Sequence, residues 1–445
     1  MEKAGFLTSK KERASYGAWF IGQNIIYMMV LSYLAIFLTD EVGIASAAVG
    51  TLLLIARVWD AVNDPMLGAL VDKVEPKKGK FKPWINTVSL VMPIATIFVF
   101  WNFHGSDGFN LTYAYISYII WGMLYTISDV PIFSLATTMT DVPEERVSII
   151  SIGRLAAGLA AMVIGIASPQ LINNLGYQQA IIILMIVSLV IMLPLRFYVK
   201  ERVKYKREEN ISLKSMIKNI TSNKYLLIFY AAFIALNATL TSMTVAPYFA
   251  KWNLGDLGIQ TIIMITLVIP MLLIPIFTPK FVNLFGKRKI FIWGISSSII
   301  FSIIQYFAGY DNFPLFLTLN SLKSFGLYMP LMMMGIFTAD CVEYGHYTTG
   351  IRKEGITFSV QTFSTKLGGA ISGAIALFVM TLYGFNGKAS VQTAEALKGI
   401  WIANTLIPVI GLVIALVIFV LFYDLTEEDV SRMIKEMADQ KEIVD

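Results

Sequence analysis

The sequence is poor in cysteine, in histidine and in charged side chains. It contains one cysteine, Cys341, and two histidines, His104 and His346, among 445 residues. A disulfide framework or a thiolate metal site needs several such ligands, so we expect neither. Charged residues make up 15% of the chain, hydrophobic residues make up 56%, and the mean hydropathy is +0.67. Water would have to solvate too much apolar surface in a soluble domain of this composition, which indicates a membrane protein.

Other signals are missing as well. Apolar and polar residues do not alternate with period two, the pattern of a membrane β-barrel. The first residues, MEKAGFLTSKKER, lead into a long apolar run without a small-residue cleavage pattern, so we expect no removable signal peptide. The chain has no histidine cluster, nucleophile elbow or phosphate-binding loop, which argues against a membrane enzyme. We therefore expect no catalytic residues and no bound cofactor.

Long apolar runs are abundant. A bilayer core about 30 Å thick needs about 20 apolar residues for each helical crossing. Twelve such runs are found, at 14–39, 46–71, 84–102, 111–138, 147–168, 179–198, 225–250, 259–281, 289–309, 313–341, 355–383 and 399–423. The sequence therefore predicts an all-α membrane protein with twelve transmembrane helices.

Lysine and arginine are unevenly distributed over the connecting loops. Positively charged loops stay on the cytoplasmic side of a membrane. If the first end is inside, the outer loops hold only Lys251, Lys388 and Lys398 of the 35 basic residues. This predicts cytoplasmic termini in a multi-pass protein of the bacterial inner membrane. The net charge of +5 follows from this topology and does not indicate a nucleic-acid partner.

The longest polar stretch between spans divides the chain into two sets of six helices. We expect four parts: an N-terminal bundle at 1–198, a cytoplasmic linker at 199–224, a C-terminal bundle at 225–423 and a cytoplasmic helical tail at 424–445. Two similar segments, called the echo sequences below, support an internal repeat. The segment Gly79-Lys-Phe-Lys-Pro-Trp-Ile85 resembles Gly286-Lys-Arg-Lys-Ile-Phe-Ile292. Such a six-plus-six repeat is a known transporter plan.

Ionisable side chains within a span are costly and usually mark ion or substrate paths. In the second span Arg57, Asp60 and Asp64 have the spacing i, i+3, i+7, which places them on one helix face next to Asn63. Carboxylate and amide oxygens suit an alkali cation, and a carboxylate also suits a proton. Alternatively, Arg57 only pairs with a carboxylate to hold two helices together. One arginine neutralises one carboxylate, so the second favours a cation site.

The fourth span contains Asp129 in a setting typical of a sugar site. A carboxylate accepts hydrogen bonds from vicinal hydroxyls, and an aromatic face packs on the C–H side of a pyranose ring. The surrounding residues are Trp121, Tyr125, Thr126, Ser128 and Phe133. The alternative is that Asp129 pairs with Arg154 of the fifth span and that the aromatic residues are core.

Two lysines lie within spans of the second half. Lys366 in the eleventh span is near Gln361 and Thr362, and it either completes a charge network with the aspartates or extends its ammonium toward the interface. Lys323 in the tenth span either pairs with a structural partner or binds an anionic substrate.

At these residues the chain resembles the glycoside–pentoside–hexuronide:cation symporters, the melibiose-permease family of the major facilitator superfamily. The resemblance covers nearly the whole length. Its strongest pieces are Arg57-Val-Trp-Asp60-Ala-Val-Asn63-Asp64-Pro65, Gly79-Lys-Phe-Lys-Pro-Trp84, Tyr125-Thr-Ile-Ser-Asp129-Val-Pro131, Pro143-Glu-Glu-Arg146 and Ala339-Asp-Cys-Val-Glu-Tyr-Gly345. It implies the major facilitator fold of two six-helix bundles.

The resemblance also implies the site residues. It assigns the cation to Asp60, Asn63, Asp64 and Thr126, and the sugar to Asp129 and Arg154, with Tyr125 nearby. It matches Lys366 to a helix-eleven lysine of the family. Two sugar positions depart from the galactoside transporters, because Gln23-Asn24 stands where they have Lys-Asp and Phe133 replaces a tryptophan. Galactoside specificity is therefore not implied.

Together these features predict a symporter that takes up a sugar or glycoside by alternating access, driven by Na⁺ or alternatively by H⁺. Its partners would be the small-molecule sugar, the monovalent cation and the lipid bilayer. An anionic solute such as a glucuronide or another hexuronide is the alternative substrate, with Lys323 and Arg154 supplying positive charge.

Overall fold

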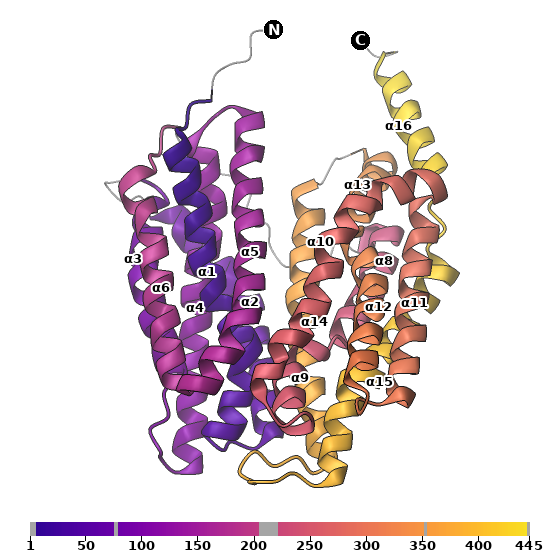
Figure 1. Ribbon diagram of the computed structural model, residues 1–445. Coiled ribbons are helices and arrows are strands. Elements are labelled where there is room, and N and C mark those ends of the chain that lie inside the picture. Colours follow the sequence, from indigo (N-terminus) through magenta and orange to yellow (C-terminus); the bar gives the residue numbers. More distant parts are fainter. Residues whose placement is uncertain (1–5, 75–78, 204–220, 351–353, 443–445) are drawn as a thin grey trace. The chain divides into compact units, whose positions relative to one another are not determined.

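The structure is a computed structural model that describes residues 6–74, 79–203, 221–350 and 354–442 (Figure 1). Throughout these ranges the chain forms helices and no strands. It divides into two compact units. Unit 1 comprises Met1–Asn210, Ala250–Thr261 and Asn386–Gln392, and unit 2 comprises Ile211–Phe249, Ile262–Phe385 and Thr393–Asp445. Most of the linker expected at 199–224 lies outside the described residues, so the predicted domain limits stay a prediction.

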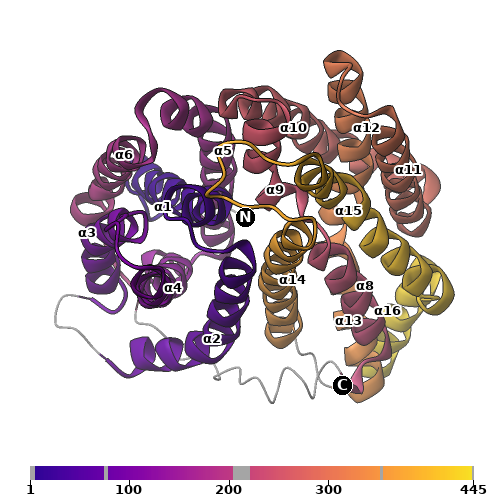
Figure 2. The same ribbon diagram turned by 90° about the horizontal axis from the view of Figure 1, so that it is seen from below.

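Unit 1 contains six long helices. They are α1 (Lys10–Ile36), α2 (Ser46–Lys73), α3 (Lys82–Val99), α4 (Asp107–Met139), α5 (Pro143–Leu175) and α6 (Tyr177–Tyr198). Helix α1 packs against α5 and α6, while α4 packs against α2 and α3. Viewed along the helices, α1 lies between α5 and α6 (Figure 2). Its central position explains why aromatic residues such as Tyr16 and Trp19 are fully buried.

Unit 2 contains nine α-helices in the described residues, some long and some short. They are α8 (Lys224–Ala238), α9 (Ser242–Tyr248), α10 (Gln260–Phe285), α11 (Lys287–Ala308), α12 (Phe313–Met332), α13 (Met334–Thr349), α14 (Glu354–Leu382), α15 (Ala394–Phe422) and α16 (Glu427–Glu442). The last of these confirms a helix in the predicted tail.

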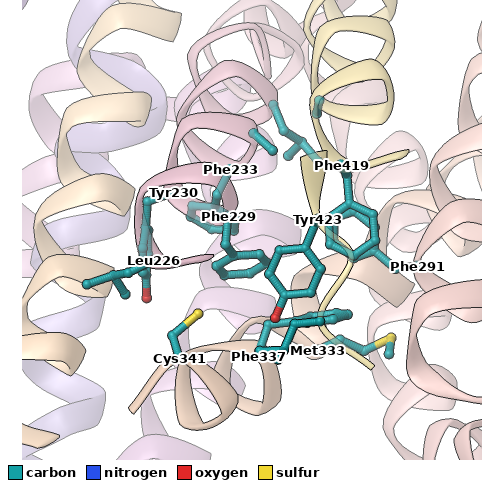
Figure 3. Close-up of a cluster of buried hydrophobic side chains, with 14 of the residues drawn as sticks. Leu226, Phe229, Tyr230, Phe233, Phe291, Met333, Phe337, Cys341, Phe419 and Tyr423 are labelled. Atoms are coloured by element: carbon teal, nitrogen blue, oxygen red, sulfur yellow. The ribbon is translucent and has the colours of Figure 1, made fainter. Parts of the chain in front are cut away.

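An aromatic cluster holds four helices of unit 2 together (Figure 3). The rings of Phe291 on α11 and Phe419 on α15 are 4.1 Å apart, and Phe337 on α13 lies 5.3 Å from both. Phe229 on α8 lies 5.2 Å from Phe337. The single cysteine, Cys341, is buried in this cluster as a free thiol, in agreement with a structural role.

Two predicted spans are interrupted in the structure. The seventh span is divided between α8 and α9 at residues 239–241, and the tenth is divided between α12 and α13 at Met333. Pro330 precedes the second break and removes a backbone donor there. Hydropathy reports only the length of an apolar run, so neither break was expected.

Eleven helical segments of the described residues are long and apolar enough to cross a membrane. Helix α2 is not one of them, although its 28 residues would span a bilayer. Polar side chains such as Arg57, Asp60 and Asn63 lower its hydropathy. The all-helical membrane class is confirmed, while the count of twelve spans and the cytoplasmic termini stay predictions.

The two echo sequences make the same kind of contact. In unit 1, Glu201 accepts hydrogen bonds from the backbone N–H groups of Lys80, Phe81 and Lys82, at 2.8–3.1 Å. In unit 2, Glu427 accepts one from the backbone N–H of Lys287, at 2.8 Å. Each glutamate follows the sixth long span of its half, so the repeat seen in the sequence extends to its local interactions.

Glu145 fixes the start of α1. This fully buried carboxylate at the beginning of α5 accepts hydrogen bonds from the backbone N–H groups of Leu7 and Thr8 and from the Thr140 hydroxyl. Burial by itself raises the pKa of Glu145, but the hydrogen bonds from Thr140 and Thr8 outweigh burial and lower the pKa to about 2. The carboxylate therefore stays ionised over the physiological pH range.

Candidate functional site

The predicted site begins where α2 meets α4. A methyl group at Gly122 would lie only 2.9 Å from Asp60 Oδ1, so the carboxylate of α2 rests directly against the backbone of α4. Thr126 lies one turn further along α4, and its hydroxyl donates to the carbonyl of Gly122 at 3.2 Å. Two predicted cation ligands, Asp60 and Thr126, thus both lie beside Gly122, and the glycine permits the approach of Asp60.

Arg57 pairs with Asp60 within the same helix. Its Nη1 lies 3.1 Å from Asp60 Oδ2, and both side chains are largely buried. The pair lies within α2, and Arg57 also interacts electrostatically with Tyr118 of α4 and Tyr27 of α1, so the structural alternative considered for this arginine stays open. The two oxygens of Asp60 differ in their surroundings, since Oδ2 faces Arg57 and Oδ1 faces Gly122.

Asn63 is the third predicted ligand of this site. It is 3% exposed, and its Nδ2 has no hydrogen-bond partner among the described residues. An amide turned by 180° would present an oxygen at that position, and a buried amide atom without a hydrogen-bond partner among the described residues fits a site that holds an ion or water. Asp64 belongs to α2, but its side chain lies outside the described residues, and its role stays a prediction.

Asp129 lies on α4, one turn beyond Thr126. The side-chain amide of Gln23 on α1 donates to Asp129 Oδ1 at 3.3 Å and to the Ser128 hydroxyl at 3.0 Å. The amide of Asn24 turns back and donates to the carbonyl of Phe20. Of the two predicted helix-one residues, Gln23 thus hydrogen-bonds to Asp129, while the Asn24 amide bonds within its own helix.

Arg154 on α5 is exposed and forms no ion pair in the described part of the chain. Both Arg154 and Asp129 are close enough to Tyr16 of α1 to interact with it electrostatically. The pairing of Arg154 with Asp129 therefore stays an alternative to the sugar site. Both charges lie near the same buried tyrosine, with Arg154 accessible.

Aromatic rings form a stack beside these carboxylates. Tyr125 stacks on Trp121 at 5.5 Å and on Tyr27 of α1 at 5.0 Å, and Trp121 stacks on Tyr118 at 5.9 Å. Phe133 instead meets Phe20 edge to face at 5.3 Å. Tyr27, Tyr118, Trp121 and Tyr125 therefore form an aromatic wall. Tyr125, a predicted sugar contact, is only partly buried in this wall.

The remaining predicted residues belong to α14 of unit 2. Gln361 has a buried Oε1 without a hydrogen-bond partner in the described part of the chain. Lys366 is half-buried, and the side chain of Thr362 lies outside the described residues. Their participation in a sugar site stays a prediction.

Sequence reasoning missed two contributors to the unit 1 site. Gly122 has no functional group, and only its contact with Asp60 reveals its role. Tyr27 was hidden in the apolar run of α1, and its stacking on Tyr125 depends on the packing of α1 against α4. The spacing of aromatic residues in the fourth span signalled the stack without showing its partner.

Charged side chains, a buried amide and a stack of aromatic rings within the helices of a membrane protein are typical of a solute transporter. The chain belongs to the family described as MFS/sugar transport protein, which it matches over residues 15–427. It is therefore a multi-pass membrane symporter of the sugar-transporting class and not an enzyme. The resemblance to glycoside–pentoside–hexuronide symporters is confirmed.

Two curated relatives and one solved structure illustrate the likeness. The chain is 28% identical over 436 residues to the glucuronide carrier protein homolog of Escherichia coli, covering 95% of this chain and 94% of that one. It is 28% identical over 424 residues to the isoprimeverose transporter of Lactiplantibacillus pentosus, covering 93% and 88%. The nucleoside transporter NupG has the same fold, with a TM-score of 0.69 at 15% identity over 92% and 99% of the two chains.

Proposed function

We propose that the protein couples the entry of Na⁺ to the uptake of a sugar or glycoside by alternating access, in the bacterial cytoplasmic membrane. The cation is held by Asp60, Asn63, Asp64 and Thr126. The observation that carries this assignment is the approach of Asp60 Oδ1 to Gly122, one turn from Thr126. Oxygen ligands from two helices are what an alkali cation needs. H⁺ bound by a carboxylate is the alternative coupling ion.

The sugar binds to Asp129, Arg154 and Gln23 and packs against the aromatic wall at Tyr125. Asp129 accepts hydrogen bonds from sugar hydroxyls, and Arg154 donates to ring or linkage oxygens. Thr126 and Asp129 lie three residues apart on α4, so the two solutes share one helix face. A cation that balances the charge of Asp60 and Asp64 therefore favours sugar binding, and by linkage the sugar favours the cation equally.

Uptake of an anionic sugar is the second candidate. Arg154 is exposed and without an ion pair in the described part of unit 1, so it is available to a carboxylate. A relative named as a glucuronide carrier homolog is in keeping with such a substrate, whereas a relative named as an isoprimeverose transporter is in keeping with a neutral one. The substrate panel below separates the two.

The test is uptake into proteoliposomes under an imposed Na⁺ gradient or an imposed pH gradient. The panel contains isoprimeverose, a β-glucoside and the matching β-glucuronide, which differs from the glucoside only at C6. We expect accumulation of a neutral member with the Na⁺ gradient and little with the pH gradient alone. Accumulation driven only by the pH gradient would show that H⁺ is the coupling ion in place of Na⁺. Accumulation of no member of the panel would contradict sugar symport.

Gly122→Ala is expected to weaken Na⁺ activation without removing any charge. The added methyl group would press on Asp60 Oδ1 and displace a ligand oxygen, so the Na⁺ concentration for half-maximal uptake should rise about tenfold. The measurement is the Na⁺ dependence of uptake at saturating sugar. Gly108→Ala on the same helix is the control, since a methyl group there meets no atom within 4 Å. An equal response of both variants would show that Gly122 does not place the cation ligand.

A further inference from the structure

Unit 2 contains a pocket that none of the proposed sugar or cation residues line. Its volume is about 240 Å³, and it lies between α9, α10, α11, α12 and α15. The walls are mostly apolar, with Phe249, Leu267 and Leu327 among them. The polar lining consists of serine and asparagine side chains, Tyr328 and one charged residue, Lys323.

Lys323 is deeply buried at this pocket. It is 8% exposed, and it shares one face of α12 with Asn320, Ser324 and Leu327, spaced i, i+3, i+4, i+7. No aspartate or glutamate lines the pocket, and Lys323 forms no ion pair with any described residue. The other buried lysine of unit 2, Lys287, makes the contrast, because its ammonium pairs with Asp340.

An ammonium without a counter-ion is costly at this depth. A buried charge is normally paired or hydrogen-bonded, and ionisable residues in transmembrane segments typically face a cavity that serves an ion or a substrate. A structural role is filled better by an apolar side chain of the same length, such as methionine. The retention of an ammonium at the wall of a cavity therefore points to a ligand that brings the negative charge.

The interrupted seventh span supports a ligand site here. Leu240 and Ser242, at the break between α8 and α9, line the pocket. The break is held by α15, since the Thr241 hydroxyl donates to the carbonyl of Ala403 and the Ser242 hydroxyl donates to that of Asn404 at 3.1 Å. Irregular backbone at membrane depth is tolerated where it is buried in protein or lines a cavity, and transporters place ligands at such breaks.

Donors for an anion are present on the facing helix. Ser298 and Ser302 lie one turn apart on α11 and are each 2% exposed, and neither hydroxyl forms a hydrogen bond with a described residue. A glycine contact holds α12 against α11, because a methyl group at Gly326 would lie 2.4 Å from Ser297 Oγ and 2.7 Å from the carbonyl of Gly294. Lys323, three residues before Gly326, is thereby held near these serines.

We propose that this pocket binds the carboxylate of a small organic monoanion, with Lys323 as counter-ion and Ser298 and Ser302 as hydrogen-bond donors. The apolar walls receive the carbon body of the anion. One lysine balances one negative charge, so a dicarboxylate is disfavoured. The carboxylate belongs either to a free acid or to an acidic sugar, and the probes below distinguish these sources.

The test is calorimetric titration of the full chain in detergent with sodium benzoate, benzamide and sodium D-glucuronate. Benzamide has the shape of benzoate without its charge. We expect binding of benzoate, or of glucuronate if the carboxylate comes from a sugar, and no binding of benzamide. In Lys323→Met the affinity for the bound anion should fall about tenfold or more, and Lys323→Arg should retain part of it.

Lys398→Met, which removes an exposed lysine of α15, is the control and should bind like the unmodified protein. The double variant Ser298→Ala, Ser302→Ala keeps the charge and should bind several-fold more weakly, which preserves the test if Lys323→Met does not fold. Equal binding of benzoate and benzamide, unchanged affinity in Lys323→Met, or no binding of either anion would overturn the proposal. Because binding is measured without a gradient, failure of Na⁺-driven sugar uptake would leave this result unaffected.

Discussion

Replacing Asp60 with asparagine is expected to lower Na⁺-driven sugar uptake by at least about 100-fold. The change keeps the size of the side chain but removes the negative charge that lies against Gly122. It also leaves Arg57 without the carboxylate that lies 3.1 Å away. The cation loses a negatively charged ligand, and the unpaired Arg57 repels it, so both effects oppose occupation of the site. The measurement is initial uptake in proteoliposomes under an imposed Na⁺ gradient.

A double variant separates these two causes. If Asp60 only neutralises Arg57, then Arg57→Gln combined with Asp60→Asn removes both charges and should restore uptake. If Asp60 is a cation ligand, the double variant should stay as inactive as Asp60→Asn. Asp107→Asn is the matched control, since Asp107 is an exposed residue of α4 whose partner is Lys388. Restoration in the double variant would refute the proposed cation site.

Asp129→Asn is expected to weaken sugar binding by about 100-fold while sparing Na⁺ binding. The carboxylate accepts hydrogen bonds from sugar hydroxyls, and an amide at the same place offers one acceptor oxygen and a competing donor. Because Asp60 and Thr126 are untouched, the cation should still bind. Calorimetry of the purified protein measures both affinities separately.

Ser134→Ala, a change on the same helix beyond the aromatic wall, should leave both affinities unaltered. If Asp129→Asn instead weakened Na⁺ binding and left the sugar affinity intact, the two proposed sites would have to be exchanged. If both affinities fell together, the thermal unfolding midpoint of the variant would be compared with that of the unmodified protein, to detect a loss of the α4 packing. A native unfolding midpoint with both affinities lost would contradict separate cation and sugar sites.

Much of the unit 1 site could be predicted from the sequence because it is carried by charged residues at helical spacing. Asp60, Asn63 and Asp129 are polar residues within otherwise apolar spans, so the sequence alone marks them as unusual. The structure added particular contacts of these residues. Arg57 pairs with Asp60 on its own helix, and Gln23 donates a hydrogen bond to Asp129.

The unit 2 pocket could not be predicted in the same way. Lys323 was recognised as an unusual residue, but one sequence left a structural partner and an anionic ligand equally open. The choice depends on what surrounds its ammonium, and those residues come from α9, α10, α11 and α15. No local pattern links segments so far apart in the chain.

The sequence by itself determined the membrane environment, the helical class and the positions of the costly charges, because the cost of placing apolar or charged groups in a bilayer depends on each segment alone. Only the tertiary structure decided the contact of Asp60 with Gly122, the breaks in the seventh and tenth spans, and the enclosure of Lys323 without an acidic partner in the described residues. These features depend on close packing between distant segments, where glycines and small side chains set how near two helices come.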